Sequence, residues 1–413
     1  MLPLVHRFLK NVHTKNPILE RATLLDLARI VSEGGFQWDV TSCLVLIACA
    51  LGSISRDFEM STPSPMETSL DDAQSLAMAE AYYTAARKRL GLLESSIQAT
   101  QCWFLTGIFE MYSMRPLSGW SSFSRACTFI ELRLCMQSQS NIQPIERSEQ
   151  RLYWSCLKSE TELREEFELP PPGLARLEHP DVLPTPPEST PDLSNGEPSS
   201  DGAWHEVHQQ SWYYYLSDIA YRRISNRTIA ALYSAPEEQW LSTPTQQLFT
   251  IAEELDAQVC QWWSHIPSHV QGSPGPTFQA DTDELTYMLY LNYADLRERI
   301  WRPFLYIVVH CDAAEVLDLK VRAGASRCLE VSFGMLESAR LKHRHHGCWQ
   351  TVRCMLTKAL LVLAATKSAR LDVRSDWRRY VEIFQDYLRY WEDEAPDLGA
   401  AKHALSALLI DID

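Results

Sequence analysis

The chain has 413 residues and a formal net charge of −15. A protein this acidic repels the phosphate backbone, which excludes a free-standing nucleic-acid-binding protein. Only 15 residues are glycine. This argues against β-rich and phosphate-loop architectures, because both need glycine at tight turns and at close backbone approaches.

Helix-forming segments follow one another through the first 170 residues. Asn16 and Pro17 are residue types that open a helix, since asparagine caps the first turn and proline lacks an N–H that would be unpaired there. Asp39 or Thr41 starts a helix that runs to Leu51 and is apolar on nearly every side, as a buried helix is. Further helices are expected at 76–93, 97–114, 119–137 and 145–167.

A proline-rich segment then interrupts the helical pattern. Residues 175–204 combine six prolines with serine, aspartate and glutamate, and contain almost nothing apolar to bury. This composition predicts a mobile loop. An acidic interaction segment is the alternative, and a solvated surface loop is favoured over it.

The helical pattern resumes after this loop, with helices expected at 204–232 and 244–263. Asp281-Thr282-Asp283-Glu284 resembles a capping box and opens a long helix that Pro303 is expected to kink near its end. Apolar residues at helical spacing line one stripe of this helix: Leu285, Leu289, Leu296 and Ile300. The last helices are expected at 313–341, 346–371, 375–394 and 400–410.

Alternating strand patterns are scarce, so the sequence predicts an all-α, multi-helix fold with one long Pro-rich disordered loop. We expect a single domain over residues 1–413. Eleven dispersed cysteines without a C-x-x-C pair indicate a reducing compartment rather than a disulfide framework. The most apolar runs, 43–51 and 360–365, are too short to span a bilayer, so we expect a soluble intracellular protein.

A histidine cluster and two acidic clusters are candidates for a metal or catalytic site. His343-x-His345-His346 is the densest group of histidines, but no acid or cysteine lies at helical spacing beside it, so a helix end is favoured over a metal site. Asp71-Asp72 and Glu392-Asp393-Glu394 lack the further carboxylates that Mg²⁺ and a diphosphate need. We therefore predict no catalytic residue, metal or cofactor. An all-α small-molecule-binding protein or isoprenoid-type enzyme remains the alternative.

Five ordered segments together resemble one known family. They are an opening "VH" and "PIL" within 4–19, the "RLYWSC" of 151–156, an "L…W…P" over 255–267, the "WRPFLY" of 301–306 and the "HHG" of 345–347. These segments are similar to the regulatory middle region of fungal binuclear zinc-cluster transcription factors, the fungal-specific transcription factor domain. The resemblance marks a set of signature positions that hold helices together: Phe8, His13, Pro17, Trp154, Trp263, Pro267, Trp301, Arg302 and Pro303.

The chain departs from the family pattern in two places. Leu169-Pro170-Pro171-Pro172 stands where the family has Gly-Arg-Pro, and the cysteine-rich zinc cluster that binds DNA does not occur in this sequence. Either an upstream zinc-cluster exon is missing, or the product naturally lacks that module.

The resemblance implies a nuclear, non-enzymatic transcriptional regulator that does not itself bind nucleic acid or membrane. Its expected partners are other transcription factors or co-regulators, with homo- or heterodimerisation and a small-molecule effector as further possibilities. Control of a biosynthetic or catabolic gene cluster is a further expectation from the resemblance.

Overall fold

A computed structural model describes residues 1–59, 70–140, 147–167, 169, 174, 184, 201–271, 282–311 and 318–412. All regular elements of these residues are helices, which confirms the all-α prediction. The chain divides into two compact units. Unit 1 comprises Met1–Asp57, Pro63–Leu216 and His343–Trp349, and unit 2 comprises Phe58–Thr62, Ser217–Lys342 and Gln350–Asp413. The single domain expected over 1–413 stays a prediction.

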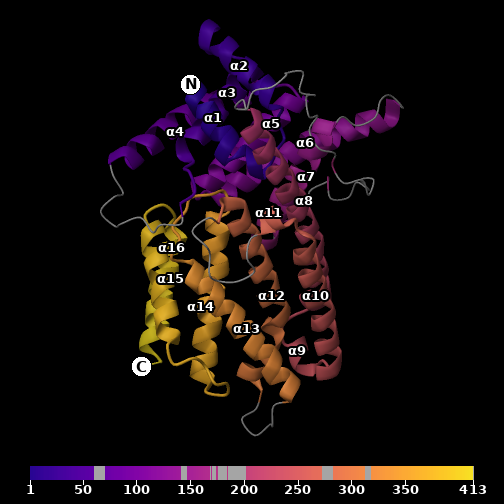
Figure 1. Cartoon of the computed structure of the whole chain (residues 1–413), viewed down its shortest axis with the longest axis vertical. Coiled ribbons are helices and arrows are strands. Elements are labelled where there is room, and N and C mark those ends of the chain that lie inside the picture. Colours follow the sequence, from indigo (N-terminus) through magenta and orange to yellow (C-terminus); the bar gives the residue numbers. More distant parts are fainter. Residues whose placement is uncertain are drawn as a thin grey trace. The chain divides into compact units, whose positions relative to one another are not determined.

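Unit 1 is built around a central helix, α3, that packs on α1, α4 and α5 (Figure 1). Asp39 caps α3, its Oδ1 accepting from the Ser42 N–H at 2.8 Å, and the helix is buried along nearly all its length as its composition predicted. At Gly52 the backbone of α1 comes so close that a Cβ would overlap the Leu4 carbonyl. The elements of unit 1 are α1 (Leu2–Asn11), η1 (His13–Lys15), α2 (Arg21–Gly34), α3 (Val40–Ile54), α4 (Leu70–Leu90), α5 (Ile97–Tyr112), α6 (Pro116–Ser140), α7 (Arg147–Phe167) and the start of α8 (Asp201–Leu232).

The expected helix start at Asn16 and Pro17 is wrong. The chain leaves α1 through the short 3-10 helix η1, and α2 begins only at Arg21. Tertiary hydrogen bonds hold the intervening residues out of a helix. The Leu19 N–H donates to His13 Nε2 at 3.1 Å, and Gln101 Nε2 of α5 donates to the Ile18 carbonyl at 2.9 Å.

A buried carboxylate connects three helices of unit 1. Glu110 of α5 accepts from the Tyr83 hydroxyl of α4 at 2.5 Å and from Ser122 Oγ of α6 at 2.6 Å. The same face of α4 buries Ala79 and Ala86. These contacts hold one face of α4 against unit 1, so the opposite face of the helix points to solvent.

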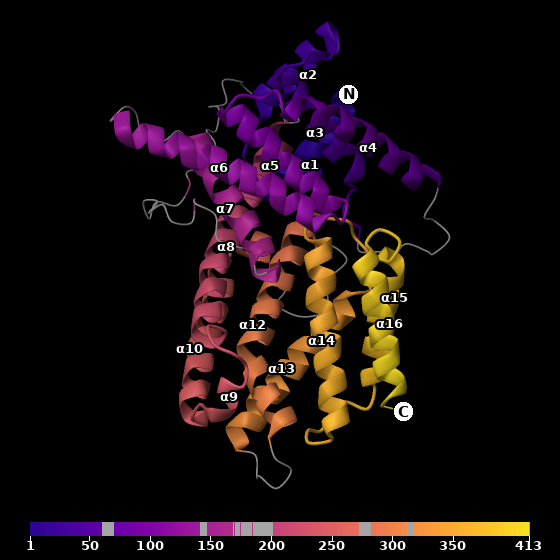
Figure 2. The same ribbon diagram turned by 180° about the vertical axis from the view of Figure 1, so that it is seen from behind.

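Unit 2 is a set of long helices in which α10, α12, α14, α15 and α16 run alongside one another (Figures 1 and 2). Helix α12 packs on α10 and α13, and α13 packs in turn on α15. Asp283 caps α12, with Oδ1 accepting from the Thr286 N–H at 2.8 Å, and α12 continues through Pro303 to His310. The elements are the end of α8, α9 (Gln239–Ser242), α10 (Thr245–His265), α11 (Ser268–Gln271), α12 (Glu284–His310), α13 (Leu319–Ser338), α14 (Cys348–Ser368), α15 (Trp377–Trp391) and α16 (Pro396–Ile410).

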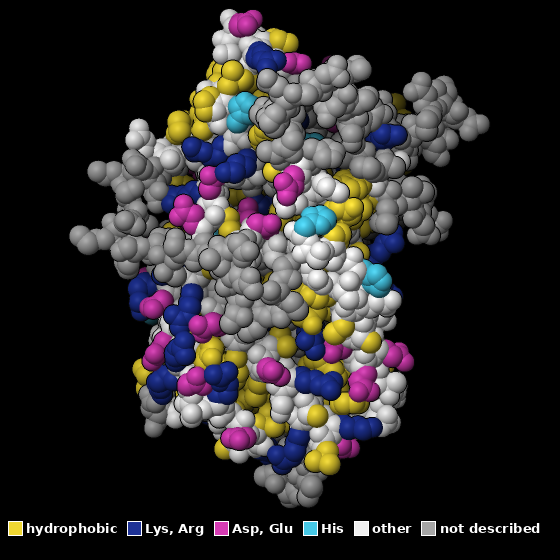
Figure 3. All heavy atoms as spheres, viewed as in Figure 1, with side chains coloured by type: hydrophobic (Ala, Val, Ile, Leu, Met, Phe, Trp, Pro, Cys, Tyr) yellow, Lys and Arg dark blue, Asp and Glu magenta, His cyan; other side chains and the backbone are white. Residues whose placement is uncertain are grey.

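The mobile loop expected at 175–204 lies almost wholly outside the described residues, and α8 begins at Asp201 rather than at the expected 204. Helix α14 is long and apolar enough, with a mean hydropathy of 1.2, to cross a membrane by length and composition, and half of that stretch is buried within the protein. On the visible face of unit 2, basic and acidic side chains are interspersed (Figure 3).

Candidate functional site

His13 is a signature position that lies buried in unit 1. Its ring packs 5.9 Å from that of Phe8, and its Nε2 accepts the Leu19 N–H. Burial, together with the nearby positive charges of His208 and Arg151, lowers the pKa of His13 to about 3. The imidazole is therefore neutral at physiological pH and serves as a hydrogen-bond acceptor that closes the segment from His13 to Leu19, which contains the buried Pro17.

Arg151 brings the first two resemblance segments together. This α7 residue is completely buried, and its Nη2 donates to the carboxylate of Glu20 at the start of α2. From α8, the Tyr215 hydroxyl donates to the Arg151 carbonyl at 2.6 Å. Trp154, one turn along α7, is half-buried and packs edge-on against Tyr153 with centroids 5.6 Å apart. Arg151, rather than the signature position Trp154, thus joins α7 to the start of α2 and to α8.

A small cavity of about 10 Å³ lies between this segment and α8. Ser211 Oγ donates to the Thr14 carbonyl at 2.6 Å, and the Arg21 guanidinium lies 4.3 Å from the centre of the Trp204 ring. His13 and His208 also line the cavity. A volume of this size holds about one water molecule. The arrangement is a packed junction of helices, and a larger ligand would have to displace side chains.

Two further signature positions end α10 in unit 2. Trp263 is buried, and its ring centre lies 4.8 Å from that of Tyr293 on α12. Pro267 follows the helix end, and its carbonyl accepts from the Val270 and Gln271 N–H groups at 2.8 and 2.9 Å, which starts α11. These residues hold the α10–α11 corner against α12.

The "WRP" positions of α12 have separate structural roles. Trp301 is fully buried, with its ring centre 5.7 Å from that of Phe249 of α10. Pro303 has no N–H, so it cannot pair with the carbonyl of Arg299 four residues earlier. The Tyr233 hydroxyl, just beyond α8, donates to this carbonyl at 2.6 Å instead. The proline is thus accommodated inside α12 by a side chain from another element.

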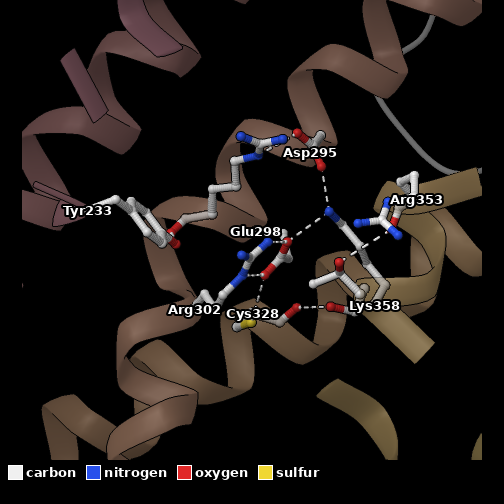
Figure 4. A network of polar contacts seen from close by, with 10 residues as sticks. Tyr233, Asp295, Glu298, Arg302, Cys328, Arg353 and Lys358 are labelled. Carbon is white, nitrogen blue, oxygen red and sulfur yellow. Dashed lines mark hydrogen bonds and ion pairs between the residues drawn. The ribbon is translucent and has the colours of Figure 1, made fainter. Parts of the chain in front are cut away.

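Arg302 belongs to a network of buried charges between α12 and α14 (Figure 4). We call it the α12–α14 charge network, and its members are Asp295, Glu298, Arg299, Arg302 and Lys358. Arg302 donates to both oxygens of Glu298 at 2.8 Å. The Lys358 ammonium lies between the two carboxylates, 2.8 Å from Glu298 Oε2 and in contact with Asp295. Arg299 Nε lies 2.8 Å from the other oxygen of Asp295.

The cations of this network keep both acids ionised. Burial alone would raise the pKa of Glu298, but Arg302 and Lys358 lower it to about 2. Burial is likewise outweighed at Asp295, where Arg299 and Lys358 hold the pKa well below its ordinary value. Burial would lower the pKa of Lys358, yet the two carboxylates raise it above its ordinary value. All members are thus charged and paired, which is how a protein tolerates buried charge.

Cys328 of α13 lies at the edge of this network, with Sγ 3.7 Å from Glu298 Oε1. Burial and the negative charge of Glu298 raise the pKa of this thiol well above its ordinary value. A thiol that stays protonated is a poor nucleophile. The network therefore has the chemistry of a structural tie between helices.

The sequence analysis singled out Arg302 as a signature position but did not identify the other members of the network. A signal was present at Lys358, which is a lone charged residue inside an apolar helical run. A buried lysine requires a carboxylate partner. Only the packing of α14 on α12 identifies Asp295 and Glu298 as those partners.

The histidine cluster is part of a turn. His343 and His345 are buried in the segment that connects the end of α13 at Ser338 to the start of α14 at Cys348, so the helix end expected at this cluster is wrong. His345 Nδ1 accepts the Gly347 N–H at 3.1 Å, and Cys348 Sγ donates to the His343 carbonyl at 3.2 Å. Among the described residues, no group of three or more His, Cys, Asp or Glu side chains is arranged to hold a metal ion.

Comparison with known families assigns the first part of the chain. Residues 5–175 match the family model described as the fungal specific transcription factor domain. The match contains the first two resemblance segments, and Arg151 joins them in the structure. It covers less than half of the chain, and the signature positions from Trp263 to Pro303 lie beyond it. No curated protein and no solved structure matched the chain.

Proposed function

Because residues 5–175 are a fungal specific transcription factor domain, we propose that the chain is a transcriptional regulator that controls genes through other proteins. The family match is the observation that carries this proposal. The family is one of transcription factors and not of enzymes, so we assign the chain no catalytic activity. The buried histidine, arginine and lysine described above have structural partners, in keeping with this assignment.

The proposed regulator acts in the nucleus and reaches DNA through a partner. A net charge of −15 opposes direct contact with the phosphate backbone. Most of the cysteines are buried, with Cys102 beside Cys43 and Cys127 beside Cys156, whereas a binuclear zinc cluster needs six closely spaced cysteines. The DNA-contacting partner would be a complete relative or another transcription factor, and co-regulators would bind the same chain. Biosynthetic or catabolic genes are the proposed targets.

The small cavity beside His13 favours protein partners over a small-molecule effector. Its volume of about 10 Å³ leaves no room for an organic ligand without movement of the surrounding side chains. Regulation would then depend on which proteins occupy the outer helix faces. A metabolite effector in this cavity would require the Arg21–Trp204 contact or the Ser211–Thr14 hydrogen bond to open.

Deleting the gene and measuring transcripts across the genome tests this function. We expect a defined set of transcripts to change, and the same set to recover when the full chain is restored. A tagged chain should be nuclear by microscopy and should associate with chromatin at those genes. Unchanged transcripts in the deletion strain, under conditions where the chain is made, would refute the proposal.

The enzyme alternative predicts a different result. The purified chain would convert an isoprenoid diphosphate in the presence of Mg²⁺. We expect no turnover above that of buffer, and turnover in proportion to the amount of chain would overturn the regulatory assignment.

A further inference from the structure

An open groove lies on the outer face of α4, opposite the face held by Tyr83. It has a volume of about 560 Å³. Trp38, which precedes α3, forms one wall of the groove. Small side chains of α4 form its floor, and charged side chains lie along its length. The lining residues are Trp38, Ala77, Glu80, Ala81, Thr84, Ala85, Lys88 and Arg89.

The wall of this groove is an exposed tryptophan ring held against an arginine. Trp38 is 64% exposed, and the Arg89 guanidinium lies 4.7 Å from the centre of its ring. Arg89 is itself fixed, because its Nε donates to the Gln37 carbonyl and its Nη1 to the Ala85 carbonyl, both at 2.7 Å. Met78 on α4 is 40% exposed. A fixed, exposed tryptophan beside small residues is typical of the anchor point of a protein interface.

The charges of this face are self-complementary. Glu80 and Lys88 each lie four residues from Thr84, in opposite directions along one helix face. If two α4 helices packed antiparallel about a two-fold axis at Thr84, each Glu80 would lie opposite Lys88 of the other copy. Both residues are available at the surface. Glu80 is 47% exposed although it pairs with Arg115, and exposed Lys88 has no hydrogen bond or ion pair within the described parts of the chain.

We propose that a second copy of this chain docks on the α4 groove to form a symmetric dimer. In this dimer the α4 helices pack antiparallel, with alanines 77, 81 and 85 allowing the backbones to approach closely and Trp38 of each copy covering the edge of the contact. A two-fold interface must match itself, and the Glu80–Thr84–Lys88 arrangement meets that condition. Binding of a different protein would not require this surface to be complementary to itself.

Charge-reversal variants test this dimer, with light scattering of the full chain over a range of concentrations as the readout. We expect the wild type to reach about twice the monomer mass of 47.3 kDa. Lys88→Glu places Glu80 opposite glutamate at both ends of the interface and should raise the dissociation constant by about tenfold or more. Glu80→Lys should do the same, through lysine opposite lysine.

Mixing the two variants is the decisive experiment. One copy then carries glutamate at both positions and the other lysine at both, so opposite charges face each other again and a mixed dimer should form. Arg227→Glu, at an exposed position of α8, is the matched control and should leave the dimer unchanged. Circular dichroism checks that each variant keeps its helix content.

A monomeric wild type at all concentrations would overturn the proposal, as would a dimer that Lys88→Glu leaves intact. Failure of the mixture to associate, with both variants folded, would refute the antiparallel arrangement. None of these outcomes bears on the transcript test of the proposed function, because a monomeric regulator would still change transcripts when deleted.

Discussion

At the scale of single residues, burial of His13 makes the stability of the protein depend on pH. The unfolded chain binds a proton at this imidazole below its ordinary pKa of 6.5, whereas the folded chain does not do so until about 3. The contribution of His13 is therefore fully present above 6.5 and is lost as the pH falls toward 3. Its neutral form is also the one that accepts the Leu19 N–H.

We expect the free energy of unfolding to fall by about 2 kcal/mol between about pH 7 and about pH 5 because of this group. Urea denaturation at several pH values in that range measures it. His13→Gln keeps a hydrogen-bond acceptor but cannot titrate, so its stability should decline less over the same interval. An equal decline in both proteins would show that His13 does not couple folding to pH.

A second residue-scale prediction concerns Tyr233 and Pro303. Tyr233→Phe removes the donor to the Arg299 carbonyl and should cost about 1–2 kcal/mol of stability. In a Pro303→Ala background, residue 303 regains an N–H that can pair with this carbonyl, so the same substitution should cost much less. Urea denaturation of the four proteins gives the coupling energy. Equal costs in the two backgrounds would contradict the role assigned to Tyr233.

At the scale of helices, the α12–α14 charge network holds two long elements of unit 2 together. Lys358→Met leaves Asp295 and Glu298 buried without the ammonium between them. We expect a loss of about 3–5 kcal/mol in the free energy of unfolding, measured by chemical denaturation.

The matched control lies on the same helix. Lys367 forms an ion pair with Asp411, and both side chains are more than half exposed. Lys367→Met should change stability by less than about 1 kcal/mol, because exposed ion pairs contribute little. Similar losses in the two variants would mean that the network is no stronger than a surface pair.

Helices were predictable wherever local signals and burial agreed. The apolar run after Asp39 and the cap at Asp283 are both helix starts in the structure. The helix start at Asn16 was mispredicted because two hydrogen bonds hold that segment outside a helix. One comes from Gln101, which is distant in sequence, and the other joins Leu19 to the side chain of His13. Helix propensity depends on neighbouring residues, so it cannot predict contacts with residues that are distant in sequence.

At the scale of the whole molecule, the acidity of the chain governs its behaviour toward DNA. We expect no sequence-selective binding of duplex DNA by the isolated chain at physiological salt, measured by gel mobility shift. The physical reason is that few counterions would be released by a protein with a net charge of −15. Tight, sequence-selective binding without a partner would overturn the proposed dependence on another DNA-contacting protein.

The sequence by itself determined that the protein is all-α, that it is acidic and that its first part resembles a fungal regulatory domain. Periodicity, charge and ordered motifs are properties of neighbouring residues and can be read along the chain. The tertiary structure alone decided that Arg151 pairs with Glu20, that Lys358 lies between two carboxylates, and that the outer face of α4 presents a groove beside Trp38. Each of these depends on segments brought together by packing, and no local pattern encodes which helices will meet.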